Sequence, residues 1–221
     1  MTNKTSLVDS AYAEVKHRIL DNRYQPGYQA LEQEIAEDLG MSRTPVREAL
    51  IRLQHDGLVE LVPRRGVRIV PVVSSDMKEI YEVLTALESM AAELLARRQP
   101  DAKALAPMTS ATDDMRAALE RDDLEAWAEA DERYHRALLD LCGNKRIASM
   151  ANTVREQGHR ARMVTLRLRE KPVNSIRDHR ALLDAIEEGD WQSAKRIHYE
   201  HRQRASEELT RILEKYNLPQ L

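Results

Sequence analysis

Four side chains in the later part of this sequence are of the types that bind divalent metal ions. They are one carboxylate and three imidazoles: Asp131, His135, His179 and His201. Asp131 and His135 are four residues apart and therefore share one face of a helix. Trp127 and Leu138 lie on the same stripe, so this face is expected to point into a protein core. A carboxylate placed there is costly unless it is paired or bound to a metal.

The two later histidines occupy comparable positions on other predicted helices. His179 shares an apolar stripe with Leu182 and Ile186. On the last helix, His201 shares one with Leu209. Three imidazoles and one carboxylate suit Zn²⁺, Ni²⁺ or Mn²⁺, with Zn²⁺ as the default on availability. The alternative is a core network without metal, because a buried histidine is usually hydrogen-bonded to a carbonyl and an aspartate can pair with an arginine.

Three further side chains are candidates for contact with a small-molecule effector near these residues. His198 lies three residues before His201 and is either a competing metal ligand or a partner of one. Arg155 and Arg162 are seven residues apart on one predicted helix, and they either anchor an anionic effector or are solvated. The remaining histidines have no such neighbours and are interpreted as surface or structural residues: His17, His55 and His159.

The elements that must position these residues are predicted to be helices. From Asp76 onward the sequence has no strand pattern, and its apolar residues recur with helical spacing. The breaks between helices have turn chemistry, as at Gln99-Pro100 and Cys142-Gly143-Asn144. Six helices are predicted, at 76–98, 102–121, 124–141, 145–169, 174–188 and 190–216. An antiparallel all-helical bundle of about 145 residues is the expected architecture.

An earlier stretch, 40–58, reads GMSRTPVREALIRLQHDGL and predicts a helix that follows a tight turn. Pro45 favours a helix start at Thr44 or Pro45, and Ser42 or Thr44 can cap this helix. The front end of the second helix in a helix-turn-helix contacts base edges and phosphates of DNA. The polar residues at this front end are Ser42, Arg43, Thr44 and Arg47.

The segments around this stretch complete a predicted winged helix. Helices are expected at 6–22 and 31–39, and two short strands are expected at 58–62 and 67–72. A turn with two cations, Pro63-Arg-Arg-Gly66, separates the strands. We expect this turn to contact the DNA backbone or the minor groove, with Gly66 allowing close approach. Its residues in this role are Arg64, Arg65 and Gly66.

Composition and charge limit the class of protein. The formal net charge is −3, yet the segment from Met41 to Val70 has six arginines and three carboxylates, a local charge of +3. Such a local excess of cations is typical of a nucleic-acid contact surface. The single cysteine, Cys142, excludes an internal disulfide and a cysteine-based zinc cluster. The sequence has no membrane-spanning apolar run and no signal peptide, so a cytoplasmic protein is expected.

Two parts of the sequence carry a family resemblance. The motif SRTPVREAL at 42–50, followed by GLV at 57–59 and PRRG at 63–66, resembles the winged-helix signature of the GntR superfamily of bacterial transcription regulators. The remainder resembles the all-helical FCD effector domain of the FadR-like branch, and its six helices are similar to the VanR-like subgroup. The resemblance implies a DNA-binding domain at 1–72 and an effector-binding and dimerisation domain at 73–221.

The resemblance also implies a ligand set and a mechanism. FCD domains commonly hold a metal through an Asp-x-x-x-His pair on one helix and two later histidines, and DERYH supplies Asp131 and His135 here. DHR supplies His179, and the closing HYEH supplies His201. A homodimer on a palindromic operator is implied, with a small effector, an organic acid, in the cavity that holds the metal. Effector binding is expected to release DNA, as in a repressor.

The sequence departs from the family pattern at two positions. Family members often carry an arginine four residues before the Glu of an L-E pair, and Leu84 stands there instead. If that arginine normally anchors an effector carboxylate, another residue must do so here. Gln33 stands where the first helix of the helix-turn-helix often has an arginine, and it can still reach a base or a phosphate.

Two other functions were weighed for the helical part. It could be a metal-dependent enzyme, since an Asp/His₃ site with an open position can activate water. Against this, no general base lies on the same stripes, because Glu132 follows Asp131 and is expected to point elsewhere. The second alternative is a ligand-free dimerisation bundle. The prediction is therefore a transcription regulator and not an enzyme.

Overall fold

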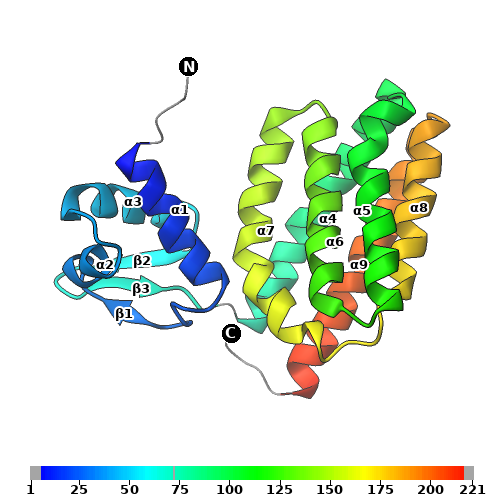
Figure 1. The fold of residues 1–221 in the computed structure, drawn as a ribbon. Coiled ribbons are helices and arrows are strands. Elements are labelled where there is room, and N and C mark those ends of the chain that lie inside the picture. Colours follow the sequence, from blue (N-terminus) through cyan, green and yellow to red (C-terminus); the bar gives the residue numbers. More distant parts are fainter. Residues whose placement is uncertain (1–5, 72, 217–221) are drawn as a thin grey trace. The chain divides into compact units, whose positions relative to one another are not determined.

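The computed structural model describes residues 6–71 and 73–216. The chain divides into two compact units, and the division falls between Val73 and Ser74 (Figure 1). Parts of the predicted domains lie outside the described residues: 1–5 of the first, residue 72 at its predicted end, and 217–221 of the second.

The first unit packs three helices against a small antiparallel sheet. The helices are α1 (Leu7–Leu20), α2 (Glu32–Asp38) and α3 (Arg43–His55). The strands are β1 (Gln29–Ala30), β2 (Val59–Val62) and β3 (Gly66–Ile69), in the order β1-β3-β2. Ser6 caps α1, since its Oγ accepts the backbone N–H of Asp9. Ile19, Leu50 and Val67 belong to the core that these elements enclose.

The structure differs from the predicted winged helix in three places. Helix α3 begins at Arg43, and Ser42 holds the N-cap position without a side-chain hydrogen bond to the helix. Strand β1 was not predicted, because two residues are too short to show alternation. Strand β3 is shorter than the predicted 67–72. It pairs with both β1 and β2, and Val62 lies opposite Gly66.

The second unit is an all-helical bundle. Its helices are α4 (Ser74–Arg98), α5 (Ala102–Glu120), α6 (Leu124–Leu141), α7 (Lys145–Leu166), α8 (Val173–Glu187) and α9 (Trp191–Lys215). Asp123, Asn144 and Asp190 cap α6, α7 and α9 with their side chains. Helix α7 ends at Leu166, three residues before its predicted end at Arg169, and α8 begins directly after Pro172.

Most helices of the bundle pack around α4. This helix packs along α9 and also contacts α6, α7 and α8, while α5 packs against α6 and α8 (Figure 1). The predicted fold class, a winged helix-turn-helix followed by an all-helical bundle, is confirmed. Within residues 6–71 and 73–216, none of the helices is both long enough and apolar enough to cross a bilayer.

Candidate functional site

The predicted DNA-contacting residues of α3 lie at its exposed front end. Ser42 and Thr44 are exposed, and the side chains of Arg43 and Arg47 are 65% and 68% exposed. Both guanidiniums lie close to Glu32 on α2, but the nitrogen–oxygen distances are 3.8 and 3.9 Å. Such long, exposed contacts contribute little, so both arginines remain available to another partner.

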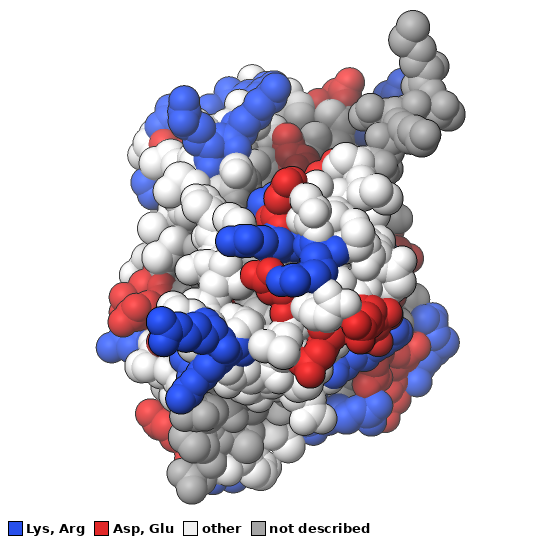
Figure 2. Space-filling model, turned by 90° about the vertical axis from the view of Figure 1, so that its left-hand side faces the viewer, with Lys and Arg blue, Asp and Glu red and all other residues white. Residues whose placement is uncertain are grey.

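The predicted wing is the turn between β2 and β3. Arg64 and Arg65 are exposed at its tip, and Arg64 has a φ of 64°. Gly66 has a structural task in addition to any role at DNA. A Cβ there would lie 2.1 Å from the carbonyl oxygen of Ala30, so the pairing of β1 with β3 requires glycine. On the face drawn in Figure 2, blue Lys and Arg side chains form separate groups with acidic side chains between them.

Gln33, the remaining predicted DNA-contacting residue, is exposed on α2. Its Nε2 donates a hydrogen bond of 2.6 Å to Glu37 Oε1, one turn further along the helix. A base or phosphate would have to compete with this exposed bond.

The four predicted metal-binding side chains converge inside the second unit. Asp131 Oδ1 lies 3.7 Å from His135 Nε2 and 3.8 Å from His179 Nε2. Nitrogen atoms of His135, His179 and His201 lie within 4.8 Å of one another, and all three residues are buried. Helix α6 supplies Asp131 and His135, α8 supplies His179, and α9 supplies His201. The cluster has the composition and spacing to hold a metal ion.

The hydrogen bonding of these imidazoles fits a metal. His135 Nε2 and both ring nitrogens of His179 are buried and have no hydrogen-bond partner among the described residues. Buried polar atoms are ordinarily paired, so His135 Nε2 and one ring nitrogen of His179 are open to a metal, which binds each imidazole through a single nitrogen. Burial, together with His201 nearby, lowers the pKa of His179 well below its usual value. The imidazole is therefore neutral, which is the form that binds metals.

Neighbouring side chains orient the candidate ligands. The Tyr134 ring stacks on His179 at a centroid distance of 3.9 Å, and its hydroxyl donates to the His179 carbonyl at 3.1 Å. His201 Nδ1 lies 3.4 Å from Asp178 Oδ2, an oxygen that also accepts a hydrogen bond from Arg204. A carboxylate on Nδ1 leaves Nε2 of the same ring directed at a metal.

A buried carboxylate that the sequence analysis did not select, Glu88 on α4, is bonded to one of these ligands. It is fully buried, and its Oε2 lies 3.0 Å from His135 Nδ1 and 2.9 Å from His198 Nε2. Arg155 Nη1 donates to its Oε1 at 3.1 Å, and Arg202 Nε donates to its Oε2 at 2.7 Å. Burial raises the pKa of Glu88, but Arg202, His135 and Arg155 outweigh it and hold the pKa well below the usual value.

The three predicted effector contacts lie in two different environments. Arg162 lines a cavity beside the cluster, and its side chain is 15% exposed. Arg155 is 2% exposed and His198 is 1% exposed, and neither belongs to the cavity lining described below. The alternative that both arginines are solvated is wrong, because Arg155 bonds to Glu88 and both guanidiniums contact Glu132.

The cavity has a volume of about 890 Å³ and opens between α6, α7, α8 and α9. Asp131 and His201 line it, so the metal-type cluster forms part of its wall. His159, which was interpreted as surface or structural, also lines it. Burial, with Arg162 close by, lowers the pKa of His159 to about 4. Polar and charged side chains from several helices thus surround a space of effector size.

Glu132 lines the same cavity, which corrects the expectation that it points elsewhere. Arg155 Nη2 donates to its Oε2 at 2.6 Å, and Arg162 Nη2 lies 3.4 Å from the same atom. Burial raises the pKa of Glu132, but the two arginines outweigh it and lower the pKa to about 2. A carboxylate of such low basicity is a poor general base.

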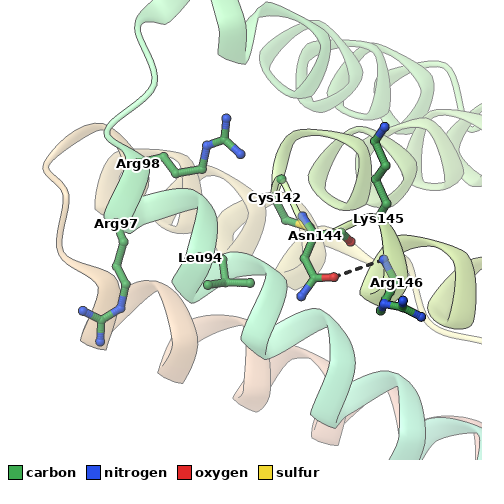
Figure 3. Close-up of a pocket in the computed structure, with 8 residues that line it drawn as sticks. Leu94, Arg97, Arg98, Cys142, Asn144, Lys145 and Arg146 are labelled. Atoms are coloured by element: carbon green, nitrogen blue, oxygen red, sulfur yellow. Dashed lines mark hydrogen bonds between the residues drawn. The ribbon is translucent and has the colours of Figure 1, made fainter.

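A second hollow lies where α6 turns into α7, with a volume of about 620 Å³ (Figure 3). Arg97 and Arg98 come from the end of α4, and Arg97 is paired with Glu93 and stacked on Trp191. The Asn144 side chain is used as the α7 cap, shown by its bond to the Arg146 backbone. The residues that line this second hollow include no histidine and no carboxylate, which distinguishes it from the cavity beside the histidines.

The chain belongs to the GntR family of bacterial transcriptional regulators. Residues 7–69 match the family model described as bacterial regulatory proteins, gntR family, and residues 79–204 match the FCD domain. The predicted family resemblance is therefore confirmed, and the protein is a GntR-type regulator with an FCD effector domain. Regulators with this DNA-binding unit bind DNA, and FCD domains bind small-molecule effectors.

Individual proteins agree with this assignment. The chain is similar to an HTH-type transcriptional regulator of Agrobacterium vitis from the TAR-I ttuE-ttuC' intergenic region, with 51% identity over 60% of this chain and 78% of the relative. The HTH-type transcriptional repressor RspR of Escherichia coli (strain K12) is 24% identical over 85% of this chain and 82% of its own. The solved structure of E. coli McbR/YncC has the same fold, with a TM-score of 0.78, 22% identity, and coverage of 96% and 99%. The two relatives found by sequence and the matching gntR family are transcriptional regulators, which confirms the prediction that the protein is not an enzyme.

Proposed function

We propose that this protein is a homodimeric, metabolite-responsive repressor that holds a divalent metal and a small organic acid in the cavity of its second unit. One observation carries the proposal. Unpartnered nitrogens of His135 and His179 face the Asp131 carboxylate in the wall of a cavity that is also lined by Arg162. A metal satisfies the nitrogens, and an anion satisfies the metal and the arginine.

Four side chains would hold the metal: Asp131, His135, His179 and His201. Three imidazoles and one carboxylate suit Zn²⁺ on availability, with Ni²⁺ and Mn²⁺ as alternatives. When bound, the metal supplies a Lewis acid that can accept a carboxylate oxygen of the effector. If an arginine at the position of Leu84 anchors the effector elsewhere in the family, Arg162 on α7 takes that role here, because Leu84 is buried and apolar.

Charge balance supports an anionic effector. Among the described residues, three carboxylates and three guanidiniums form one inner cluster: Glu88, Asp131, Glu132, Arg155, Arg162 and Arg202. Their formal charges cancel. A divalent metal adds two positive charges to a poorly solvated region, and such an excess is costly unless a counterion accompanies it. An organic acid supplies that counterion.

The first unit supplies the DNA contacts. Arg43, Thr44 and Arg47 enter the major groove from the front end of α3, and Ser42 and Gln33 lie beside them. The exposed wing arginines, Arg64 and Arg65, contact the backbone or the minor groove. Two such units on a two-fold axis bind a short palindromic operator.

An exposed apolar surface supports dimerisation through the second unit. Val83 and Met90 are seven residues apart on α4 and are 42% and 36% exposed, and Met150 on α7 is 59% exposed. Helices α4 and α7 pack against each other. Exposed large apolar side chains on two helices that pack together are typical of a protein–protein contact.

Helix α4 provides a route between the two functions. It begins at Ser74, directly after the first unit, and its Glu88 contacts the candidate ligand His135. A shift of α6 or α9 on effector binding is transmitted to α4 through this carboxylate. Effector binding then favours a state with lower operator affinity, which requires different effector affinities in the two states.

The test is operator release by carboxylates. A DNA fragment selected by the protein from a random pool is titrated by fluorescence anisotropy, with metal-free and Zn²⁺-loaded protein, in the presence of acetate, succinate or citrate. We expect at least one carboxylate to weaken DNA binding of the loaded protein. Arg162→Ala should abolish this response, whereas Arg133→Ala, an exposed cavity arginine paired with Asp114, should keep it. Operator affinity that ignores all three acids in both forms would overturn the proposal.

A further inference from the structure

Glu132 is already paired with Arg162, the arginine that an effector carboxylate would need. Its Oε2 accepts a 2.6 Å hydrogen bond from Arg155 and lies 3.4 Å from Arg162 Nη2. Arg155 has a second carboxylate partner, Glu88 at 3.1 Å. Arg162 has the longer and weaker bond to Glu132, and both of these side chains line the cavity. An incoming anion therefore meets a carboxylate of the protein at its own binding position.

The same carboxylate has another partner within reach. Glu132 Oε1 lies 4.0 Å from Arg136 Nη2, one turn further along α6. Arg136 is 64% exposed, whereas Arg155 is 2% exposed. One side chain thus has a buried arginine pair on one side and a solvated arginine on the other. A change of rotamer is sufficient to exchange them.

We propose that Glu132 is an internal competitor for the effector: it pairs with Arg155 and Arg162 in the effector-free protein and moves toward Arg136 when a ligand carboxylate binds Arg162. This rests on the proposed effector site. Arg155 holds two carboxylates on different nitrogens, whereas a ligand carboxylate that takes Arg162 Nη2 meets Glu132 at the same nitrogen, so ligand and Glu132 compete for it.

The exchange has a consequence for specificity. A neutral ligand of the same shape gains nothing from Arg162 that Glu132 does not already provide, so it leaves the pair in place. An anionic ligand replaces one carboxylate with another and also neutralises the metal. A ligand must therefore displace Glu132 before it binds Arg162. This requirement restricts the site to ligands with a carboxylate.

The experiment measures succinate binding by calorimetry to Zn²⁺-loaded wild type, Glu132→Gln and a matched control, Glu129→Gln. Glu129 also lines the cavity, but it is exposed. We expect Glu132→Gln to bind succinate about tenfold tighter, the scale expected from removing a like charge a few ångströms away. Glu129→Gln should stay within about twofold of wild type. Without ligand, Glu132→Gln should melt at a lower temperature, because Arg155 and Arg162 lose a counterion.

Equal or weaker succinate binding by folded, metal-loaded Glu132→Gln would overturn the competitor role while leaving the effector site intact. Absence of succinate, acetate and citrate binding in the wild type and in both variants would instead overturn the proposed effector site, and the competitor role with it.

A second variant tests the move toward the surface. Arg136→Ala should weaken succinate binding about threefold in the wild type, the scale of an exposed ion pair. Arg136→Ala should have no effect in the Glu132→Gln background, because that background has no displaced carboxylate for Arg136 to bind. The same loss in both backgrounds would show that Glu132 does not pair with Arg136 in the bound state.

Discussion

Arginine side chains in the two units of this chain differ in what they contact. In the first unit, Arg43 and Arg47 are 65% and 68% exposed and lie 3.8 and 3.9 Å from Glu32. In the second unit, Arg155 and Arg202 are 2% and 4% exposed and donate hydrogen bonds to Glu88. Arg43 and Arg47 are available to bind a partner from solvent. Arg155 and Arg202 are already paired with a carboxylate inside the fold.

This difference separates two kinds of function. Exposed cations contribute to DNA affinity and little to folding, since a surface ion pair is worth about 0–1 kcal/mol. Buried cations are required for folding and hold other groups in place, because an unpaired buried charge costs several kcal/mol. Variants of the exposed arginines in the first unit should therefore change DNA binding with little change in the free energy of unfolding. Variants in the inner cluster of the second unit should change stability first.

The largest effect is expected for Glu88→Ala. It leaves Arg155 and Arg202 buried without this carboxylate and should lower the free energy of unfolding by about 3–5 kcal/mol, measured by urea denaturation. Glu93→Ala is the matched control on the same helix. Glu93 is itself 11% exposed, but its partners Arg97 and Lys195 are 45% and 48% exposed and stay solvated when it is removed, so its loss should cost about 0–1 kcal/mol. Equal losses in the two variants would contradict the contrast between buried and exposed cations.

Arg47→Ala should give the opposite pattern. Operator binding should weaken by about 1–3 kcal/mol, with relaxed preference at one base pair, because we propose that this side chain contacts a base edge. The free energy of unfolding should change by less than about 0.5 kcal/mol. Anisotropy with selected operator variants measures the first quantity, and urea denaturation measures the second. An unchanged base preference would remove Arg47 from sequence readout.

His159→Gln should flatten the pH dependence of stability in metal-free protein. The pKa of His159 is lowered to about 4 in the fold, against 6.5 for an ordinary histidine. Between these values the unfolded chain binds the extra proton, so the free energy of unfolding of the wild type falls as the pH falls. At pH 5, roughly midway between these values, the slope should drop by about 1.4 kcal/mol per pH unit in the variant. His55→Gln, at a side chain 91% exposed, is the matched control for the loss of one histidine. Superimposable profiles for wild type and His159→Gln would show that this ring titrates normally.

The smallest effect is expected at the wing. Arg64→Ala should reduce the slope of log binding constant against log salt concentration by about 1, with operator preference unchanged. Parallel salt titrations on operator and random DNA measure both quantities. A change of base preference without a change of slope would mean that Arg64 reads bases instead of phosphates.

The sequence was sufficient for the existence of the helices and for the inward faces that carry the candidate metal ligands. Apolar periodicity and turn chemistry predicted the helices, and the positions of Asp131, His135 and His179 on apolar stripes predicted which side chains point inward. Periodicity identifies a buried face but does not identify the helices that pack on it. The structure was needed to show that these stripes meet at one place.

The Glu88 contacts illustrate what the sequence could not provide. Arg155 is 67 residues away and Arg202 is 114 residues away, and each lies on a different helix. No local pattern links residues at such separations. Glu132 was misplaced for a related reason: it lies beside the inward stripe, and its long side chain reaches Arg155 from there.

The metal content of the purified protein, measured by mass spectrometry, tests the central claim most directly. Wild type is compared with the double variant His135→Ala/His201→Ala, and with a control double variant at exposed histidines, His17→Ala/His55→Ala. We expect about one metal ion per chain in the wild type and in the control, and almost none in the first variant. No metal in the wild type, even after reconstitution with Zn²⁺, Ni²⁺ and Mn²⁺, would contradict the account, and the Asp/His cluster would then be a metal-free core network.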